Sequence, residues 1–207
     1  MNNSNSHIIQ VYNSRKNLLE ILETRGFNTS SYNNFSISEI GILTEQDQLD
    51  MLLEDSNNKK IYVKYYINKV IKPPNVYSII EDLFYLENIL TKKDDLMIIV
   101  KDEPNDTLVQ TIKDIWMQDS IYTSTINIKR LQFNILNHVL VPKHTILSKP
   151  EEIEFKRKFN ILDNNIPDIS YFSPVSLVLG IRPTDIVKIE RKSRTAIKAD
   201  FYRICKL

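Results

Sequence analysis

Apolar residues recur at helical spacing along the first part of the chain. In HIIQVYNSRKNLLEILETRGF this spacing predicts a helix, and Gly26 is placed to end it. The apolar residues that share one face of this helix are Ile8, Val11, Leu18 and Leu22. A second helix is predicted over SISEIGILTEQDQLDMLL, where Ser36 and Glu39 have the spacing of a capping box.

The pattern then switches between strands and helices as far as residue 130. KIYVKYYI places every second apolar residue on one face, as in a strand, and LMIIV is typical of a short buried strand. Helical spacing returns in PPNVYSIIEDLFYLENIL and in NDTLVQTIKDIWMQ, where Asp106 is the expected N-cap. STINIKR is a further predicted strand. This order predicts an α/β domain with a largely parallel sheet, which we place at residues 1–137.

Short elements joined by prolines follow this first domain. Ser148 and Glu151 have capping-box spacing around Pro150, which predicts the start of a helix. SPVSLVLG predicts a compact helix that ends at Gly180. IVKIERK and DFYRICKL are predicted to be two paired strands. We therefore expect a small α+β domain over residues 138–207.

Composition narrows the class of protein but not its chemistry. The chain has 207 residues and one cysteine, so an internal disulfide and a multi-cysteine zinc site are excluded. No apolar run is long enough to span a membrane, and the polar start MNNSNSHIIQ lacks a signal pattern, so we expect an intracellular protein. Residues 1–137 carry 14 basic and 18 acidic side chains, a net charge of −4, whereas residues 138–207 carry 13 and 8, a net charge of +5. This asymmetry predicts different partners for the two domains.

Two of the three histidines lie in NILNHVLVPKHTIL and are candidates for chemistry. His138 and His144 are six residues apart, which is not the spacing of a helical zinc site, and no cysteine completes a ligand set. With three scattered glycines, a glycine-rich phosphate loop is also excluded. We expect structural histidines at a domain entry, no catalytic residue, no metal and no cofactor.

A nuclease pattern is the first alternative. Pro167-Asp168 followed by Glu190 and Lys192 matches a degenerate motif in which two carboxylates hold Mg²⁺ and a lysine steadies the attacking water. The same residues also fit a solvated, charged strand. The nuclease interpretation requires the two carboxylates to lie within a few ångströms of each other.

Two basic segments predict anionic partners. Lysines interleaved with tyrosines in KKIYVKYYINKVIK suit a nucleic-acid backbone, although an amphipathic strand has the same pattern. The lysines that we select there as DNA-proximal are Lys59, Lys60, Lys64 and Lys69. The end of the chain, KIERKSRTAIKADFYRICKL, is strongly basic and suits nucleic acid or an acidic protein surface. A free-standing DNA-binding transcription factor is therefore the second alternative.

Four blocks in order carry a resemblance to a known family: HVLVPKH, SPVSLVLGIRP, DIVKIERKSRTA and FYRIC. Together they resemble the C-terminal domain of eukaryotic RNA polymerase subunit 5 and its archaeal counterpart, which lacks the N-terminal domain. The segment NSRKNLLEILETRGF resembles the opening helix of the eukaryotic subunit. One departure is Ile197, which stands where the family usually has glycine, so the hairpin loop is expected to be reshaped.

The resemblance implies a non-catalytic subunit of a multisubunit DNA-directed RNA polymerase. The C-terminal assembly domain would dock on the largest subunit, and the N-terminal jaw domain would lie near downstream duplex DNA, with no membrane and no small-molecule substrate as partner. The divergence and the high content of Asn and Ile resemble a homologue from a large DNA virus, which implies the virion and host cytoplasm; a cellular protein would be nuclear. The residues that the resemblance places at the subunit interface are His138, Pro142, Lys143, His144, Pro174, Gly180, Arg191, Lys192, Arg194, Tyr202 and Arg203.

Overall fold

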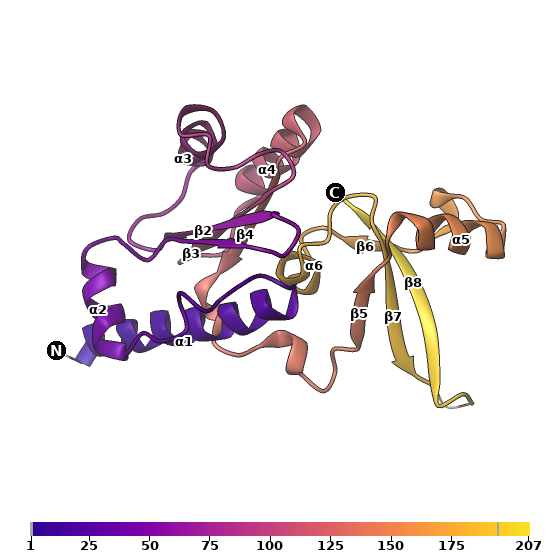
Figure 1. The fold of residues 1–207 in the computed structure, drawn as a ribbon, viewed down its shortest axis with the longest axis horizontal. Helices are drawn as coiled ribbons and strands as arrows, with labels where there is room; N and C mark the ends of the chain where they lie inside the picture. The colour runs from indigo at the N-terminus through magenta and orange to yellow at the C-terminus, as the bar shows by residue number, and fades with distance from the viewer. Residues whose placement is uncertain (1, 194) are drawn as a thin grey trace. The chain divides into compact units, whose positions relative to one another are not determined.

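The computed structural model describes residues 2–193 and 195–207, with side chains from Ser6 onward. It is a mixed α/β structure that divides into two compact units, Met1–Asn134 and Ile135–Leu207 (Figure 1). Each unit contains a four-stranded sheet. No helix in the described part of the chain is both long enough and apolar enough to cross a membrane.

The first unit is built on the sheet β1-β2-β3-β4, in which β2, β3 and β4 are parallel and β1 is antiparallel to β2. This confirms the predicted largely parallel sheet. Figure 1 shows α1 and the pair α3 and α4 on opposite sides of it, and every residue of β3 and β4 is buried. The elements are α1 (Asn2–Thr24), α2 (Ile37–Glu45), β1 (Met51–Glu54), β2 (Lys60–Tyr66), α3 (Pro73–Ile80), the π-helix η1 (Glu81–Leu86), β3 (Asp95–Val100), α4 (Asp106–Asp119), β4 (Tyr122–Asn127) and the 3₁₀ turn η2 (Ile128–Leu131).

The helix ends of the first unit follow the local sequence. Gly26 has a φ of 94° and donates its N–H to Glu23, while Phe27 donates to Leu22, so α1 ends in a Schellman motif. The capping box of Ser36 and Glu39 is present at the start of α2. The structure confirms both predictions. The sequence could specify these helix ends because each depends only on neighbouring residues.

Other boundaries in the first unit were predicted wrongly. The second helix ends before Asp47, whose φ is 53°, and Met51–Glu54 forms β1 instead of a last helical turn. Met51 and Leu53 are buried while the residues that alternate with them are exposed, which is the pattern of a strand. The N-cap of α4 is Asn105, whose side chain accepts the N–H of Leu108, one residue before the predicted Asp106. The predicted third helix becomes π-helical from Glu81, and STINIKR leaves the sheet after Asn127.

The second unit is built on the sheet β5-β7-β8-β6. The predicted pairing of β7 with β8 is confirmed and is antiparallel, as is the capping box of Ser148 and Glu151. Gly180 ends α6 with a φ of 71°, also as predicted. Two short strands were not predicted, namely β5 and β6. The elements are η3 (Ile135–Asn137), β5 (Lys143–Ile146), α5 (Lys149–Phe159), η4 (Asp163–Asn165), β6 (Asp168–Ser170), α6 (Pro174–Leu179), β7 (Ile186–Lys192) and β8 (Lys198–Lys206).

The division between the two units falls after Asn134, three residues before the domain boundary that we placed at residue 137. The description of the two parts as a jaw domain and an assembly domain remains a prediction. Each part has its own apolar core, and the second is centred on Phe155, Ile186 and Ile204.

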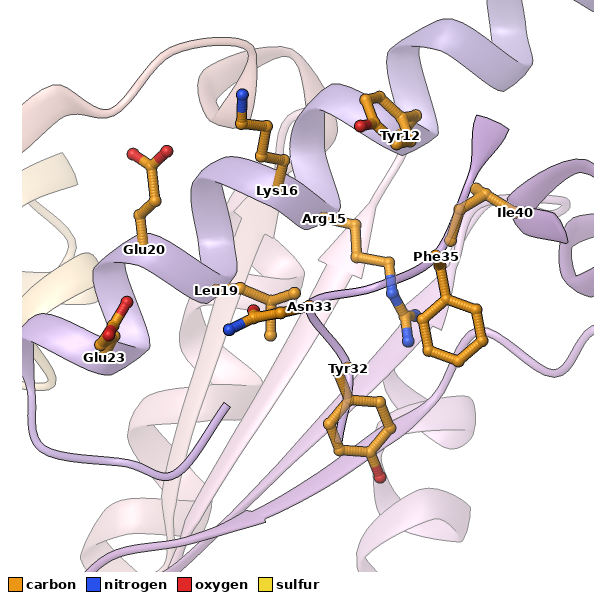
Figure 2. Close-up of a pocket in the computed structure, with 10 residues that line it drawn as sticks. All are labelled: Tyr12, Arg15, Lys16, Leu19, Glu20, Glu23, Tyr32, Asn33, Phe35 and Ile40. Atoms are coloured by element: carbon orange, nitrogen blue, oxygen red, sulfur yellow. The ribbon is translucent and has the colours of Figure 1, made fainter. Parts of the chain in front are cut away.

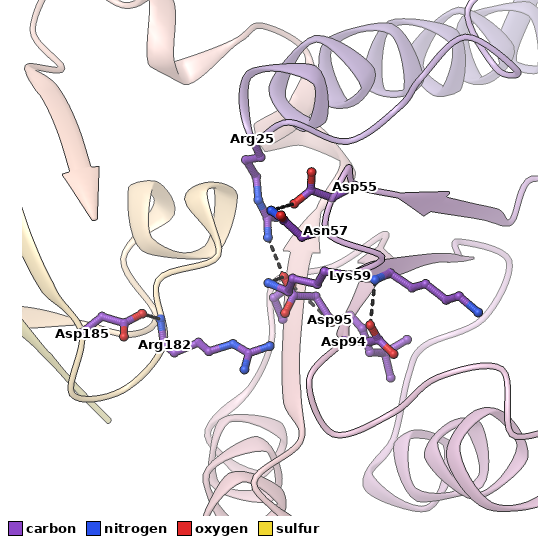
Figure 3. A network of polar contacts seen from close by, with 11 residues as sticks. Arg25, Asp55, Asn57, Lys59, Asp94, Asp95, Arg182 and Asp185 are labelled. Atoms are coloured by element: carbon purple, nitrogen blue, oxygen red, sulfur yellow. Dashed lines mark hydrogen bonds and ion pairs between the residues drawn. The ribbon is translucent and has the colours of Figure 1, made fainter. Parts of the chain in front are cut away.

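A buried carboxylate joins three segments of the first unit (Figure 3). Asp95, the first residue of β3, is fully buried and accepts from Arg25 Nη2 at 2.6 Å and from Lys59 Nζ at 2.8 Å. Its neighbour Asp94 accepts the N–H of Lys60 at 2.7 Å. The end of α1 and the start of β2 are thereby tied to the start of β3.

Asp95→Asn should lower the free energy of unfolding by about 3–5 kcal/mol, because it removes the buried carboxylate that Arg25 and Lys59 share. Urea denaturation of the full chain followed by circular dichroism measures this loss. Glu103→Gln is the matched control, since it removes an exposed carboxylate from an ion pair with Arg130 in the same unit. It should change stability by less than about 1 kcal/mol. Equal effects of the two substitutions would contradict the role assigned to Asp95.

Candidate subunit interface

The paired strands β7 and β8 present two chemically different faces. Side chains alternate along a strand, and directly paired residues point to the same side of the sheet. The register therefore places Ile186, Ile204 and Tyr202 on one face. Arg191, Phe201 and Arg203 point to the other.

The first face is occupied by helix α5. Tyr202 packs its ring against Phe155, with ring centroids 4.1 Å apart, and lies 6.3 Å from Phe159. Farther along the same face, Lys188 pairs with Asp200 at 2.8 Å and Lys198 with Glu190 at 3.5 Å. Most side chains on this face therefore already make apolar contacts or ion pairs within the second unit.

The second face carries a stack of two arginines on one aromatic ring. Arg191 Cζ lies 4.3 Å from the ring centroid of Phe201, and Arg203 Cζ lies 5.3 Å from it. Arg203 also donates to the backbone oxygen of Asp168 at 2.5 Å. In the described part of the chain neither guanidinium forms an ion pair with a carboxylate. Cation–π contact holds both cations in place while leaving N–H groups of each for an anionic partner.

His144 lies beside this stack, because β5 pairs it with Ile189 of β7. Its Nδ1 lies 2.7 Å from the backbone oxygen of Pro142, so Nδ1–H is the donor and Nε2 is left as an acceptor. Burial lowers the pKa of His144, and the positive charges of Arg191 and Arg203 lower it further. The neutral imidazole is therefore favoured. The structure brings together three of the residues selected from sequence, namely His144, Arg191 and Arg203.

The other selected residues lie elsewhere in the second unit. Lys143 lies opposite Glu190 in the register of β5 and β7, so its side chain points to the α5 face. The side chain of Lys192 points to the same face. Pro174 opens α6 and the buried Gly180 ends it, so both shape the helix. His138 is exposed and its Nδ1 accepts the N–H of Leu140. Arg194 lies outside the described residues.

Sequence reasoning missed three apolar side chains of the second unit. Val139 is 91% exposed and Leu140 is 82% exposed in the segment that leads to β5, and Phe201 carries the two arginines. Large apolar side chains in water are typical of a surface that a partner covers. The detectable signal was HVLVPKH, in which apolar residues precede a proline without helical or strand periodicity.

The loop between β7 and β8 accommodates the departure at Ile197. Ser193 Oγ accepts the N–H groups of Thr195 and Ala196 at 3.3 and 3.2 Å, which closes a turn. Ile197 does not have a positive φ, so no glycine is required there, and its side chain is 92% exposed.

The nuclease alternative is wrong, because its carboxylates diverge. In the strand register, Asp168 of β6 lies opposite Ile204 of β8, and Glu190 of β7 lies opposite Asp200 of β8. Strands β6 and β7 are on opposite sides of β8. Four residues along a strand span about 13 Å, and strands on either side of a third are about 9–10 Å apart. One metal ion cannot bridge such a separation. Within the described residues, no group of three or more His, Cys, Asp or Glu side chains is arranged to hold a metal.

The lysines selected as DNA-proximal do not form one patch. Lys59 pairs with Asp95 at 2.8 Å and Lys64 with Asp50 at 2.6 Å, so their charges are locally neutralised. Lys60 is the first residue of β2, whereas Lys69 lies three residues after its last residue, Tyr66. Two of the interleaved tyrosines are also used within the fold. Tyr65 is buried, and the hydroxyl of Tyr62 donates to Asp50 at 3.1 Å. Burial and the contact with Asp50 raise the pKa of Tyr62.

Comparison of the sequence with known proteins matches the chain to a family. The family model described as "RNA polymerase Rpb5, C-terminal domain" matches residues 133–205. The chain is 42% identical over 73 residues to DNA-directed RNA polymerase subunit Rpo5 of Thermococcus kodakarensis, covering 35% of the chain and 89% of that protein. It is also 42% identical over 74 residues to Rpo5 of Archaeoglobus fulgidus, covering 36% of the chain and 97% of that protein.

A eukaryotic relative extends the similarity to both units. DNA-directed RNA polymerases I, II, and III subunit rpabc1 of Dictyostelium discoideum is 25% identical over 192 residues, covering 92% of the chain and 94% of that protein. The shared blocks, the basic hairpin and the similarity along the whole chain agree: this chain belongs to the Rpb5/Rpo5 family of DNA-directed RNA polymerase subunits.

Proposed function

We propose that the second unit docks the chain on the largest polymerase subunit through the β7–β8 face that carries Arg191, Phe201 and Arg203. The single observation that supports this most is the stacked pair of guanidiniums without a carboxylate partner in the described residues. An acidic patch on the partner would supply the missing counter-charge, and bidentate arginine–carboxylate pairs would fix the orientation. The exposed Val139 and Leu140 would add apolar contact area.

The role is assembly and positioning, not bond chemistry. In this proposal the large subunits perform phosphoryl transfer, and the first unit projects as a jaw near downstream duplex DNA. Any contact of the jaw with DNA would be sequence-independent and weak, because Lys59 and Lys64 already pair with carboxylates and this unit has a net charge of −4. The subunit would act where its polymerase transcribes, in the nucleus of a cell or in the virion and host cytoplasm of a virus.

Arg191→Glu should reduce capture of the largest subunit at least about tenfold, since it places a carboxylate opposite the acidic partner surface. Affinity purification of the tagged full chain with quantitative mass spectrometry measures the capture. Lys192→Glu is the matched control, because it makes the same charge change one residue away on the α5 face. The docking face would be misassigned if Lys192→Glu reduced capture as much as Arg191→Glu.

The isolated chain should bind duplex DNA with a dissociation constant weaker than about 10 μM at 0.15 M salt, because its basic and acidic side chains nearly cancel. Fluorescence anisotropy with a labelled random-sequence duplex, repeated at several salt concentrations, gives the affinity and its salt slope. Submicromolar binding with a steep salt slope would favour the free-standing DNA-binding factor instead.

His144 should titrate below its ordinary pKa of about 6.5. Because the folded-state pKa is lowered, the stability contributed by the neutral imidazole is present above about pH 6.5 and is lost as the pH falls toward the lowered value. NMR titration of the imidazole resonance gives the midpoint. Arg191→Glu should raise this midpoint, whereas Lys192→Glu should leave it nearly unchanged; equal shifts would argue against the shared face.

A further inference from the structure

A cavity of about 260 Å³ opens between helix α1 and the loop that leads to α2 (Figure 2). Arg15 and Lys16 line it from one stretch of α1, and Glu20 and Glu23 line it from the next turns. Tyr32 and Phe35 close it from the loop. It lies entirely within the first unit and shares no residue with the β7–β8 face.

The guanidinium of Arg15 is the unusual group in this cavity. Arg15 is only 4% exposed, and its Cζ lies 5.5 Å from the ring centroid of Tyr32 and 5.3 Å from that of Phe35. Nη1 donates to the backbone oxygen of Leu49 at 2.8 Å, but the buried Nε has no hydrogen-bond partner. No carboxylate in the described residues pairs with it, whereas the half-buried Arg25 pairs with Asp95.

A buried cation without a counter-ion is costly for a folded chain. Burial lowers the pKa of Arg15, and the two rings compensate for only part of the lost hydration. A planar guanidinium held between aromatic rings with an unused N–H is arranged to receive an oxygen anion. A carboxylate from outside the chain would supply both the missing charge and the missing acceptor.

The opposite end of the cavity has the opposite charge. Glu20 and Glu23 are exposed carboxylates, and Figure 2 shows them on α1 away from the Arg15 guanidinium. On a helix, they lie about 7.5 and 12 Å along the axis from Arg15. A ligand that fills the cavity therefore meets the cation of Arg15 at one end and carboxylates at the other, and the residues that carry these charges are separated by about 10 Å along the helix axis.

We propose that this cavity binds a segment of another protein that presents an acidic side chain to Arg15 and a basic side chain to Glu20 and Glu23. In an extended peptide, about 10 Å corresponds to a spacing of three residues. The cavity is smaller than the roughly 300–1,000 Å³ of sites that enclose small molecules, and this size suits anchoring side chains of a longer chain. This second contact is independent of the proposed docking face.

The test uses the full chain labelled with ¹⁵N and a blocked peptide in which Asp and Lys are three residues apart in a Gly-Ser background. Titration should shift the Arg15 Nε–H signal and the backbone signals of α1 and the following loop. Replacing Asp by Asn in the peptide should weaken binding about tenfold, because a charge-assisted hydrogen bond is lost. Replacing Lys by Gln should weaken it by a smaller factor, since Glu20 and Glu23 are exposed.

Variants of the chain separate recognition from a structural role. Arg15→Met should weaken binding of the Asp-Lys peptide about tenfold while leaving the thermal midpoint unchanged or raised, because an uncompensated buried charge is removed. Arg130→Met is the matched control, since it removes an exposed arginine of the same unit and should leave binding unchanged.

Three results would overturn the proposal. The first is equal affinity for the Asp and Asn peptides, which needs no variant and so does not depend on the folding of Arg15→Met. The second is saturation of the same signals by acetate with the affinity of the peptide, which would indicate a site for small carboxylates. The third is unchanged peptide affinity in Arg15→Met.

Discussion

The register between β7 and β8 decides which side chains the second unit offers to a partner. Because alternate residues point to opposite faces, one set of backbone hydrogen bonds places Tyr202 and Ile204 against α5 and turns Arg191, Phe201 and Arg203 to the other side. A slip of β8 by one residue would turn Phe201 and Arg203 toward α5 and would remove Tyr202 and Ile204 from their contacts with it. Packing of the core and presentation of the cationic face are therefore fixed by the same pairing.

The apolar core protects that register. Phe155 and Ile166 pack with Ile186 and Ile204, and the burial of these side chains opposes any slip of β8 along β7. Phe201 has a different role, because it is half-buried and its ring holds two guanidiniums. Within β8, Ile204 thus stabilises the core, whereas Phe201 positions the arginines that we propose contact a partner.

Two arginines in the first unit show how the same residue type can be used in two ways. Arg25 pairs with Asp95 and joins the end of α1 to β3, so its charge is balanced within the fold. Arg15, ten residues earlier and within α1, has aromatic rings and a backbone oxygen around it but no carboxylate partner in the described residues. A charge that the fold balances contributes to structure, whereas one that it leaves unbalanced is available to a ligand.

The sequence by itself determined the features that depend on near neighbours. Capping boxes at Ser36 and Ser148, the glycine ends at Gly26 and Gly180, and the continuous apolar run of β3 specify their own structure over a few residues. The ordered family blocks also identified the family. Only the tertiary structure separated Asp168 from Glu190, paired Lys64 with Asp50 and brought His144 beside Arg191 and Arg203. Strand order and register join residues far apart in the chain, and the local pattern of apolar and polar positions does not encode those pairings.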